Sequence, residues 1–500
     1  MPKRATSFEL VLGERDRGIP SYRWLYSALR REILSGRLQP GTRLPATRDL
    51  ASQYKLARGT IVSAFEQLQA EGYVQGTVGS GTYVSRVLPE ALLEVAPAHA
   101  RSVASSHQKP RRLSHYAQRV QLFSGFRLTT IRAFRANLPA LNLFPAGLWA
   151  QITARRLRRA PARLFLGCDS MGSPPLREAI ADYLRTSRGV NCSAAQIAIV
   201  SGLQEALDLA ARVCLDPGDR VCMENPGYIG AAHVFAAVGA KIAPIPLDQE
   251  GMRVRARDFE AARLVYITPG HQFPMGITMS LARRLELLEC ARRSGTLIFE
   301  DDYDSEYRYA GRPVPALQGL DRHGIVLFAG SFSKVLFPSL RLAYLVVPTD
   351  LVERFAAAIS ITTRHAPSLE QAILCDFISE GHFGRHLRRM REIYAERLSV
   401  LLEAARETLA GLLEIVGIEA GLQTAAWLAH GIDGDAADKA AAQRGVEVTS
   451  LHHFHLGFPP RQGLQLGFAA VDAPEIRRGT RELAIALEGL QRKRRSAVRS

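Results

Sequence analysis

The chain has 500 residues, of which 47% are hydrophobic and 22% charged, and its formal net charge is +16. This length exceeds the ~250–300 residues that one hydrophobic core supports, and the composition excludes a disordered, collagen-like or disulfide-stapled protein. The six cysteines lack Cys-x-x-Cys spacing, the first residues lack the apolar core of a signal peptide, and no apolar run approaches the ~18 residues of a membrane span. We therefore expect at least two folded units, a cytoplasmic location and no membrane partner.

The positive charge is distributed unevenly along the chain. Residues 1–130 carry +10, residues 131–490 carry only +1, and the last ten residues carry +5. A local positive excess favours a polyanionic partner, whereas an Arg-rich composition by itself would not. The excess indicates that the first part of the chain binds nucleic acid, while the basic end at 492–495 is more typical of a solvated tail.

Residues 18–86 are predicted to form a small unit of three helices and a β-hairpin. Apolar residues at helical spacing indicate helices over about 22–34 and 58–71, with a short helix at about 44–51 between them. Two apolar pairs, 73–74 and 83–84, flank a glycine-rich turn that predicts the hairpin. The order is that of a helix-turn-helix followed by a wing, although a small helical protein-binding module would have a similar pattern.

If this unit reads double-stranded DNA, the start of its third helix would enter the major groove. Arg58, Gly59 and Thr60 open that helix, and Arg48 on the preceding helix could reach the same groove. The glycine-rich turn would bring bare backbone close to phosphates or the minor groove, through Gly79, Ser80 and Gly81.

Residues 87–130, rich in Ala, Ser, Pro and basic side chains, are predicted to be a linker. Over residues 131–490, helical runs alternate with short apolar β-branched runs, which predicts an α/β domain with a mostly parallel sheet flanked by helices. The last part, about 380–490, mixes long helices with short strands and is expected to form a smaller α+β lobe.

Lysine is scarce, and one lysine has the surroundings of a cofactor site. Only seven of the 64 basic residues are lysine, and Lys334 alone beyond residue 130 directly follows an apolar strand in a Gly-Ser-Phe-Ser-Lys sequence. Hydroxyls at Ser331 and Ser333 and the guanidinium of Arg341 could bind a phosphate beside it. Pyridoxal phosphate needs such a lysine amine for its Schiff base, so Lys334 is the aldimine candidate.

Two other strand ends could complete that site. Asp301 could pair with the pyridine nitrogen, and Tyr303, two residues on, could reach the phenolic oxygen. Acid clusters are more often metal ligands or solvated loops, but no His or Cys is clustered nearby.

The helix that begins after Gly202 could hold the phosphate, with Leu203 and Gln204 at its start. Tyr228 could stack on the pyridine ring, although a Tyr after Pro-Gly is more often simple packing.

Two groups of motifs resemble known families. Gly36-Arg-Leu-x-Pro-Gly-Thr-Arg-Leu-Pro-Ala-Thr-Arg-Asp-Leu-Ala51 and Gly79-Ser-Gly-Thr-Tyr-Val84 resemble the winged helix of GntR-type regulators. Glu224-Asn-Pro-Gly-Tyr228, Thr268-Pro-Gly-His-Gln-Phe-Pro-Met-Gly276, Glu300-Asp-Asp-Tyr-Asp-Ser-Glu306 and Ser331-Phe-Ser-Lys334 resemble the aminotransferase fold, type I of the pyridoxal phosphate enzymes. In this order within one chain they are similar to the MocR family of bacterial transcription regulators.

The resemblance implies a homodimer that binds operator DNA and senses pyridoxal phosphate, an amine or amino acid effector, or both. It implies that Lys334 carries the aldimine, that Asp301 and Tyr303 contact the pyridine nitrogen and phenolic oxygen, and that Tyr228 stacks on the ring. The phosphate ligands it implies are Gly202, Leu203, Gln204, Ser331, Ser333 and Arg341. The alternatives are an active aminotransferase with an accessory DNA-binding unit and a sensor of pyridoxal phosphate alone.

The sequence departs from the family pattern at three places. Phe273 stands where working aminotransferases usually have Asn, and Gly167–Gly172 is a degenerate form of Tyr-x-Asp-Pro-x-Gly. Gln465 occupies the stretch in which relatives that bind amino acids carry an Arg for the carboxylate, and an amide cannot form that charged bidentate pair. A conventional α-amino acid effector is therefore in doubt. The histidines of 452–455 lack nearby acidic or Cys residues in the sequence, so we expect no metal there.

Overall fold

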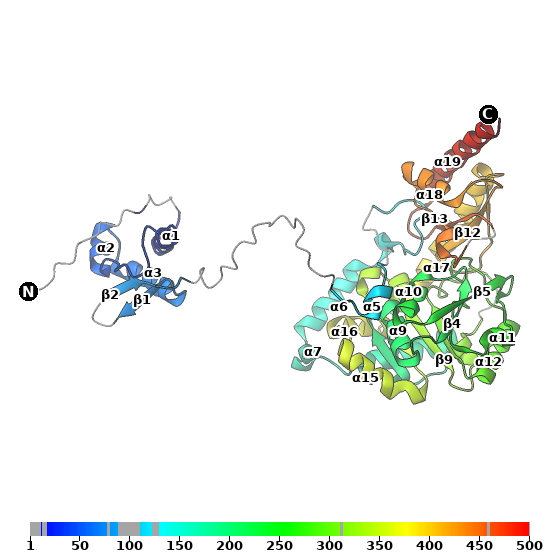
Figure 1. Cartoon of the computed structure of the whole chain (residues 1–500), viewed down its shortest axis with the longest axis horizontal. Helices are drawn as coiled ribbons and strands as arrows, with labels where there is room; N and C mark the ends of the chain where they lie inside the picture. The colour runs from blue at the N-terminus through cyan, green and yellow to red at the C-terminus, as the bar shows by residue number, and fades with distance from the viewer. Residues whose placement is uncertain are drawn as a thin grey trace, which may run out of the picture. The chain divides into compact units, whose positions relative to one another are not determined.

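A computed structural model describes Leu12 and residues 18–77, 81–88, 111–122, 130–310, 314–457 and 461–499, of which 493–499 are described by their backbone alone. The chain divides into two compact units, Met1–Arg111 and Arg112–Ser500, and each is considered by itself (Figure 1).

The small unit has three helices and a two-stranded antiparallel hairpin. Its elements are α1 (Ser21–Leu34), α2 (Thr47–Gln53), α3 (Arg58–Ala70), β1 (Val74–Thr77) and β2 (Gly81–Val84). Leu25 and Leu29 of α1 pack with Ile61 and Leu68 of α3 in a common core. This core explains the helical spacing of apolar residues in the sequence, and the predicted order of helices and hairpin is confirmed.

The large unit is built on an eight-stranded sheet in the order β3-β10-β9-β8-β7-β4-β5-β6. The central strands form one parallel series, β9-β8-β7-β4-β5. Strand β10 is antiparallel to both β3 and β9, and β6 is antiparallel to β5. The strands are β3 (Ile197–Val200), β4 (Arg220–Asn225), β5 (Lys241–Asp248), β6 (Gly251–Met252), β7 (Ala262–Ile267), β8 (Leu297–Asp302), β9 (Val326–Ser331) and β10 (Ala343–Val346). The predicted mostly parallel sheet is confirmed.

Helices cover both faces of this sheet, and successive side chains of one strand pack against the helices on opposite faces. In β3, Ala198 and Val200 pack in a core with α9, α10 and α15, whereas Ile197 and Ile199 pack in another with α8, α16 and α17. The helices are α6 (Ala146–Arg158), α7 (Ala162–Leu166), α8 (Pro174–Arg188), α9 (Leu203–Cys214), α10 (Ile229–Val238), α11 (Ala256–Phe259), α12 (Leu281–Ser294), α13 (Leu317–Leu320), α14 (Phe332–Val335), α15 (Val352–Thr362), α16 (Ser368–Ser379) and α17 (His382–Thr408).

The end of the chain forms the smaller α+β lobe that the sequence predicts. Its antiparallel sheet has the order β11-β12-β14-β13. The elements are β11 (Leu413–Ile415), β12 (Gln423–Leu428), α18 (Gly434–Gln443), β13 (Thr449–Ser450), β14 (Gly463–Gly467) and α19 (Ala473–Arg499). The segment before α6 joins this lobe, because Phe134 bridges to Gly467 and Ala133 to Val446.

Part of the segment predicted to be a linker is helical. Residues His115–Arg119 form α5, and Arg119 donates a hydrogen bond from Nε to the Ala237 carbonyl of α10 at 3.1 Å. Residues 89–110 and 123–129 of that segment lie outside the described residues. None of the helices in the described ranges is long and apolar enough to cross a bilayer.

Candidate functional site

The sheet brings residues that are far apart in sequence to one edge. Strands β4, β7, β8 and β9 are parallel, so their carboxyl ends meet, and antiparallel β10 begins at the same edge. The residues just beyond these ends, or just before β10, include Tyr228, Thr268, Tyr303, Lys334 and Arg341. The candidate residues of the large unit therefore gather at this edge.

Lys334 lies in α14, directly after β9, and its amine is held against the backbone. Nζ donates a hydrogen bond to the Asn137 carbonyl at 2.7 Å. Burial lowers the pKa of the amine to about 8, although nearby Asp304 and Asp301 act in the opposite direction. An amine with this pKa is partly neutral near physiological pH, which is the form that attacks a carbonyl carbon.

Asp301 is the next-to-last residue of β8 and a buried acid, 4% exposed. It accepts a hydrogen bond from the Tyr266 hydroxyl at 2.6 Å. Burial raises its pKa to about 7, the Tyr266 hydroxyl lowers it, and the neighbouring acids Asp302 and Asp304 raise it further. Because a cationic partner would stabilise the ionised form, this carboxyl suits a protonated ring nitrogen.

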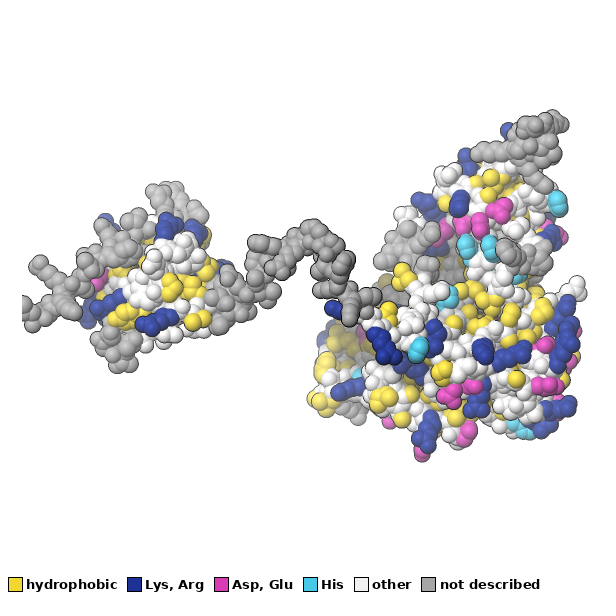
Figure 2. Space-filling model, viewed as in Figure 1, with side chains coloured by type: hydrophobic (Ala, Val, Ile, Leu, Met, Phe, Trp, Pro, Cys, Tyr) yellow, Lys and Arg dark blue, Asp and Glu magenta, His cyan; other side chains and the backbone are white. Residues whose placement is uncertain are grey.

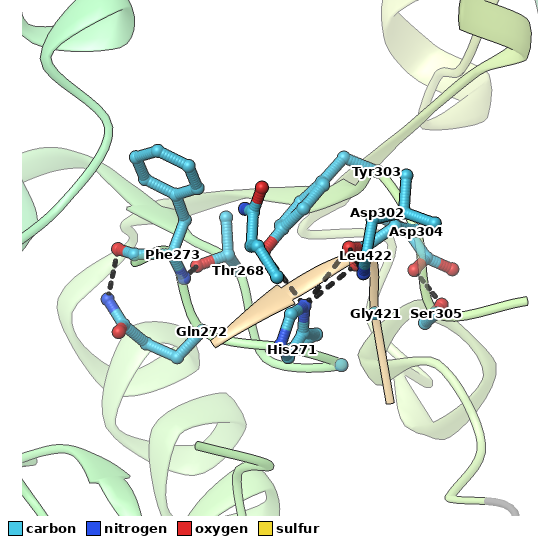
Figure 3. A network of polar contacts seen from close by, with 12 residues as sticks. Thr268, His271, Gln272, Phe273, Asp302, Tyr303, Asp304, Ser305, Gly421 and Leu422 are labelled. Carbon is cyan, nitrogen blue, oxygen red and sulfur yellow. Dashed lines mark hydrogen bonds and ion pairs between the residues drawn. The ribbon is translucent and has the colours of Figure 1, made fainter. Parts of the chain in front are cut away.

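Tyr303 and Asp304 converge on one nitrogen of His271 (Figure 3). The Nδ1 atom of His271 lies 2.9 Å from Asp304 Oδ1 and 2.9 Å from the Tyr303 hydroxyl oxygen. A hydrogen on Nδ1 serves Asp304 and faces the Tyr303 oxygen, so the phenolic hydrogen of Tyr303 remains for another acceptor. Burial, Asp304 and Asp301 raise the pKa of Tyr303 well above its usual value, which keeps the phenol a donor.

A glycine makes room for this network. Gly421 has φ +95°, and a Cβ on it would lie 2.0 Å from His271 Cε1. The next residue, Leu422, donates its backbone N–H to Asp304 Oδ2 at 3.1 Å. The loop before β12 therefore holds His271 and Asp304 in place.

A second glycine lies in the candidate phosphate cradle. Gly202 caps α9 with φ +138°, and a Cβ there would lie 3.2 Å from a guanidinium nitrogen of Arg341. Arg341 itself has φ +52°, a left-handed conformation that directs its side chain over this helix start. The backbone N–H of Ser333 donates a hydrogen bond to Ser331 Oγ at 3.2 Å. A helix N-terminus beside a guanidinium is suited to a phosphate.

Tyr228 and Gln204 contact each other instead of lying apart as separate ligands. The Gln204 amide donates from Nε2 to the Tyr228 hydroxyl at 2.7 Å. Tyr228 also meets the ring of Phe273 edge-on, with ring centroids 5.7 Å apart. One of the two Nε2 hydrogens of Gln204 is thus used, and its other side-chain hydrogen and its backbone N–H are left for a phosphate. Leu203 contributes the first helical N–H of α9.

Two buried amides lie on one face of the lobe sheet. Gln465 of β14 is opposite Ala425, and Gln423 of β12 is opposite Gly467, so the two glutamines are diagonal neighbours on the same face. Gln423 accepts the Asn137 N–H at 2.7 Å, and the Asn137 carbonyl is the acceptor of Lys334. Gln465, which stands where relatives carry an arginine, therefore lies next to Gln423, whose partner Asn137 contacts Lys334.

In the small unit, the predicted DNA-reading residues lie at the surface. Arg48, Arg58 and Gly59 are exposed and Thr60 is partly exposed, and Lys and Arg side chains are visible on the drawn face of this unit (Figure 2). Gly81 has φ +113°, and a Cβ on it would lie 2.8 Å from Arg43 Nε. Gly79 and Ser80 lie outside the described residues.

Sequence reasoning missed several residues of these sites, among them His271, Gln423 and Arg43. His271 and Arg43 stood inside motifs that carried the family resemblance, which is the signal that could have found them. It also missed an acidic neighbour of the histidines at 452–455: His452 Nδ1 lies 3.3 Å from Asp435. Within the described residues, no group of three His, Cys, Asp or Glu side chains is arranged to hold a metal.

Comparison with known proteins accounts for both units. Residues 145–483 match the family described as aminotransferase class I and II, and residues 21–84 match the family of bacterial regulatory proteins, gntR family. The probable rhizopine catabolism regulatory protein MocR of Rhizobium meliloti is 40% identical over 96% of this chain and 96% of its own length. The pyridoxine biosynthesis transcriptional regulator PdxR of Corynebacterium glutamicum is 30% identical over 91% of this chain and 93% of its own.

Among solved structures, Pyrococcus horikoshii kynurenine aminotransferase in complex with PMP is 28% identical. The match covers 72% of this chain and 92% of the enzyme's chain, with a TM-score of 0.68. The similarity to regulators thus spans nearly the whole chain, whereas the similarity to this enzyme covers the large unit's fold.

Proposed function

This chain belongs to the MocR family of transcription regulators, and from that premise we propose that it couples operator binding to the state of a pyridoxal phosphate site at Lys334. The observation that carries the proposal is the meeting of Lys334, Asp301, Tyr303 and the Gly202–Arg341 cradle at one edge of the sheet, in a chain that also has a GntR-type unit. When bound, pyridoxal phosphate supplies an aldehyde carbon that combines with primary amines.

The residues at this edge suit the cofactor group by group. Lys334 would hold it covalently, Asp301 would pair with the ring nitrogen, and Tyr303 would donate to the phenolic oxygen. Tyr228 would lie against the ring. The phosphate would be held by Arg341, Ser331, Ser333 and the α9 start at Gly202, Leu203 and Gln204. Support comes from the absence of a Cβ at Gly202 where Arg341 approaches, and from the buried carboxyl of Asp301 with its raised pKa.

Operator DNA would be read by the small unit. The exposed start of α3 carries Arg58, Gly59 and Thr60, the residues that would reach base edges, and Arg48 would contact the backbone. Arg43, beside the wing glycine Gly81, adds a cation at the other candidate contact. The positive excess of residues 1–130 supports this assignment.

The chain would act as a homodimer. Among the apolar side chains of the large unit that are strongly exposed are Phe165 at 70%, Leu166 at 87% and Ile361 at 85%. Gly167, next to Leu166, lies against His365, since a Cβ on it would be 2.6 Å from that ring, and this brings the two exposed segments together. Exposed apolar clusters of this kind favour association with a second copy.

Two alternative functions are each supported by one observation. The aminotransferase fold of the large unit and its partly neutral lysine would also suit an active aminotransferase. The relative named for pyridoxine biosynthesis favours a sensor of pyridoxal phosphate itself. Complete turnover of an amino donor and a keto acid would support the enzyme, and operator binding that responds to the cofactor but to no amine would support the sensor.

The test of the proposal is cofactor trapping followed by DNA binding. Borohydride should fix pyridoxal phosphate to the wild-type chain and not to the Lys334→Ala variant, and the wild-type affinity for operator should change with cofactor and amine. Lys241→Ala is the matched control, because Lys241 lies at the start of β5, the opposite end of a parallel strand from the site. A Lys334→Ala chain that keeps the wild-type adduct would refute the assignment.

A further inference from the structure

The Gln465 and Gln423 amides are both buried, and each has an unused donor. Each side chain is 1% exposed. Gln465 Nε2 has no hydrogen-bond partner within the described part of the chain, and Gln423 Nε2 has none at normal geometry. The Gln423 amide does lie near enough to the Tyr303 hydroxyl to lower the pKa of that tyrosine by a side-chain hydrogen bond. Because an amide nitrogen has two hydrogens, one donor of Gln423 is still unused. A buried donor without an acceptor is unfavourable, so a ligand that supplies acceptors here gains from both amides.

The sheet face that carries both amides lies against the segment that leads to the Lys334 site. Gly467, directly opposite Gln423 on the same sheet face, is so close to the segment before α6 that a Cβ on it would lie 2.0 Å from the Arg135 carbonyl. That segment continues to Asn137, which contacts both Gln423 and Lys334. A ligand whose nitrogen approaches Lys334 would therefore present its other groups to the two amides.

The charge of this region disfavours an anionic group. Asp301 and Asp304 lie close enough to Lys334 to act on its amine, and both glutamines are neutral. A carboxylate needs a cationic partner when it leaves water, and an amide supplies hydrogen bonds without charge. A hydroxyl or ether oxygen accepts the same hydrogen bonds and brings no charge.

We propose that Gln465 and Gln423 select an amine effector that carries uncharged oxygen acceptors in place of an α-carboxylate, that is, an amino alcohol. This inference rests on the proposed function, whose site it describes in more detail. It assigns the two glutamines as specificity-determining residues, and it narrows the effector from amines and amino acids to one chemical class.

The experiment compares L-alaninol with L-alanine, which differ only in the replacement of a carboxylate by a hydroxymethyl group. The full chain, loaded with pyridoxal phosphate, is titrated with each amine while the absorption spectrum of the bound cofactor is followed. The wild-type chain should be half-saturated by L-alaninol at a concentration at least about tenfold below that of L-alanine, since desolvating a carboxylate without a cationic partner costs more than the roughly 1.4 kcal/mol to which tenfold corresponds.

Gln465→Arg should reverse the preference by supplying the missing cation, and Gln465→Leu should weaken L-alaninol binding without improving L-alanine binding. Gln443→Arg, at an exposed position of α18 in the same lobe, is the matched control and should keep the wild-type ratio. The wild-type ratio is decisive even if a variant fails to fold. Equal or tighter binding of L-alanine overturns the inference and leaves the proposed function intact, whereas no spectral response to either amine overturns both.

Discussion

Replacing Gly421 with alanine should destabilise the large unit by about 2–5 kcal/mol. The backbone of Gly421 has φ +95°, and left-handed conformations cost other residues about 1–2 kcal/mol. The new Cβ would lie 2.0 Å from His271 Cε1 and 2.8 Å from Asp304 Oδ2. Both side chains are almost fully buried, so neither can move aside freely, and overpacking of this kind costs about 1–3 kcal/mol.

The assay is urea unfolding of the full chain. Of the three tryptophans, Trp24 lies in the small unit, so a Trp24→Phe background leaves the fluorescence of Trp149 and Trp427 to report on the large unit. Gly417→Ala is the control, because a Cβ there meets nothing within 4 Å and its φ is not positive. We expect the control to stay within about 0.5 kcal/mol of the parent.

A Gly421→Ala chain as stable as the Gly417→Ala chain would refute the reasoning that this glycine is required by the His271–Asp304 contact. The same substitution should also change the spectrum of bound pyridoxal phosphate, because a displaced His271 no longer holds the Tyr303 hydroxyl. A stability loss with an unchanged spectrum would separate the packing role of Gly421 from the orientation of Tyr303.

Three further predictions concern the two candidate sites. The Lys334 amine has a pKa of about 8 and only its neutral form attacks the cofactor, so the rate at which the cofactor-free chain takes up pyridoxal phosphate should rise with pH and level off above about 8. Stopped-flow absorbance measures this rate, and a rate that still rises at the ordinary lysine pKa would contradict the prediction. Asp301→Asn should weaken equilibrium binding of the cofactor about 10–100-fold, since a charge-assisted hydrogen bond contributes roughly 1.5–3 kcal/mol, and an unchanged dissociation constant would remove Asp301 from the site. Arg58→Ala should weaken operator binding by about 1–3 kcal/mol in a gel-shift titration if it contacts a base, or lower the salt slope by about 1 if it contacts a phosphate, whereas Arg322→Ala on the large unit should do neither.

The fold, and the position of Lys334 and Asp301 at one edge of the sheet, could be predicted because their signals are local. Lys334 follows the apolar strand β9 and Asp301 lies at the carboxyl end of β8, and parallel strands bring such ends together whatever their distance in sequence. The apolar spacing in α1 and α3 predicted their helices for the same reason, since one turn of helix is enough to define a buried face.

The rest of the site depends on contacts that no local pattern encodes. His271 acquires its role only by meeting Asp304, 33 residues later, beside a glycine from the C-terminal lobe. Gln423 and Gln465 are diagonal neighbours because of the antiparallel register of β12 and β14, and a shift of one residue would turn Gln423 to the other face. The helix α5 was missed because five residues are too few for a periodic signal.

The hydrogen bond between Lys334 and Asn137 gives this amine two competing uses. A free ammonium has three hydrogens, one of which holds the Asn137 carbonyl. A Lys334 nitrogen that held the cofactor covalently would have at most one hydrogen left to donate. Asn137 belongs to the segment by which the chain enters the α/β core, and that segment pairs with the C-terminal lobe at Phe134. If the site is loaded at Lys334, this entry segment would lose part of its anchoring, and amide hydrogen exchange at residues 133–137 would report the change.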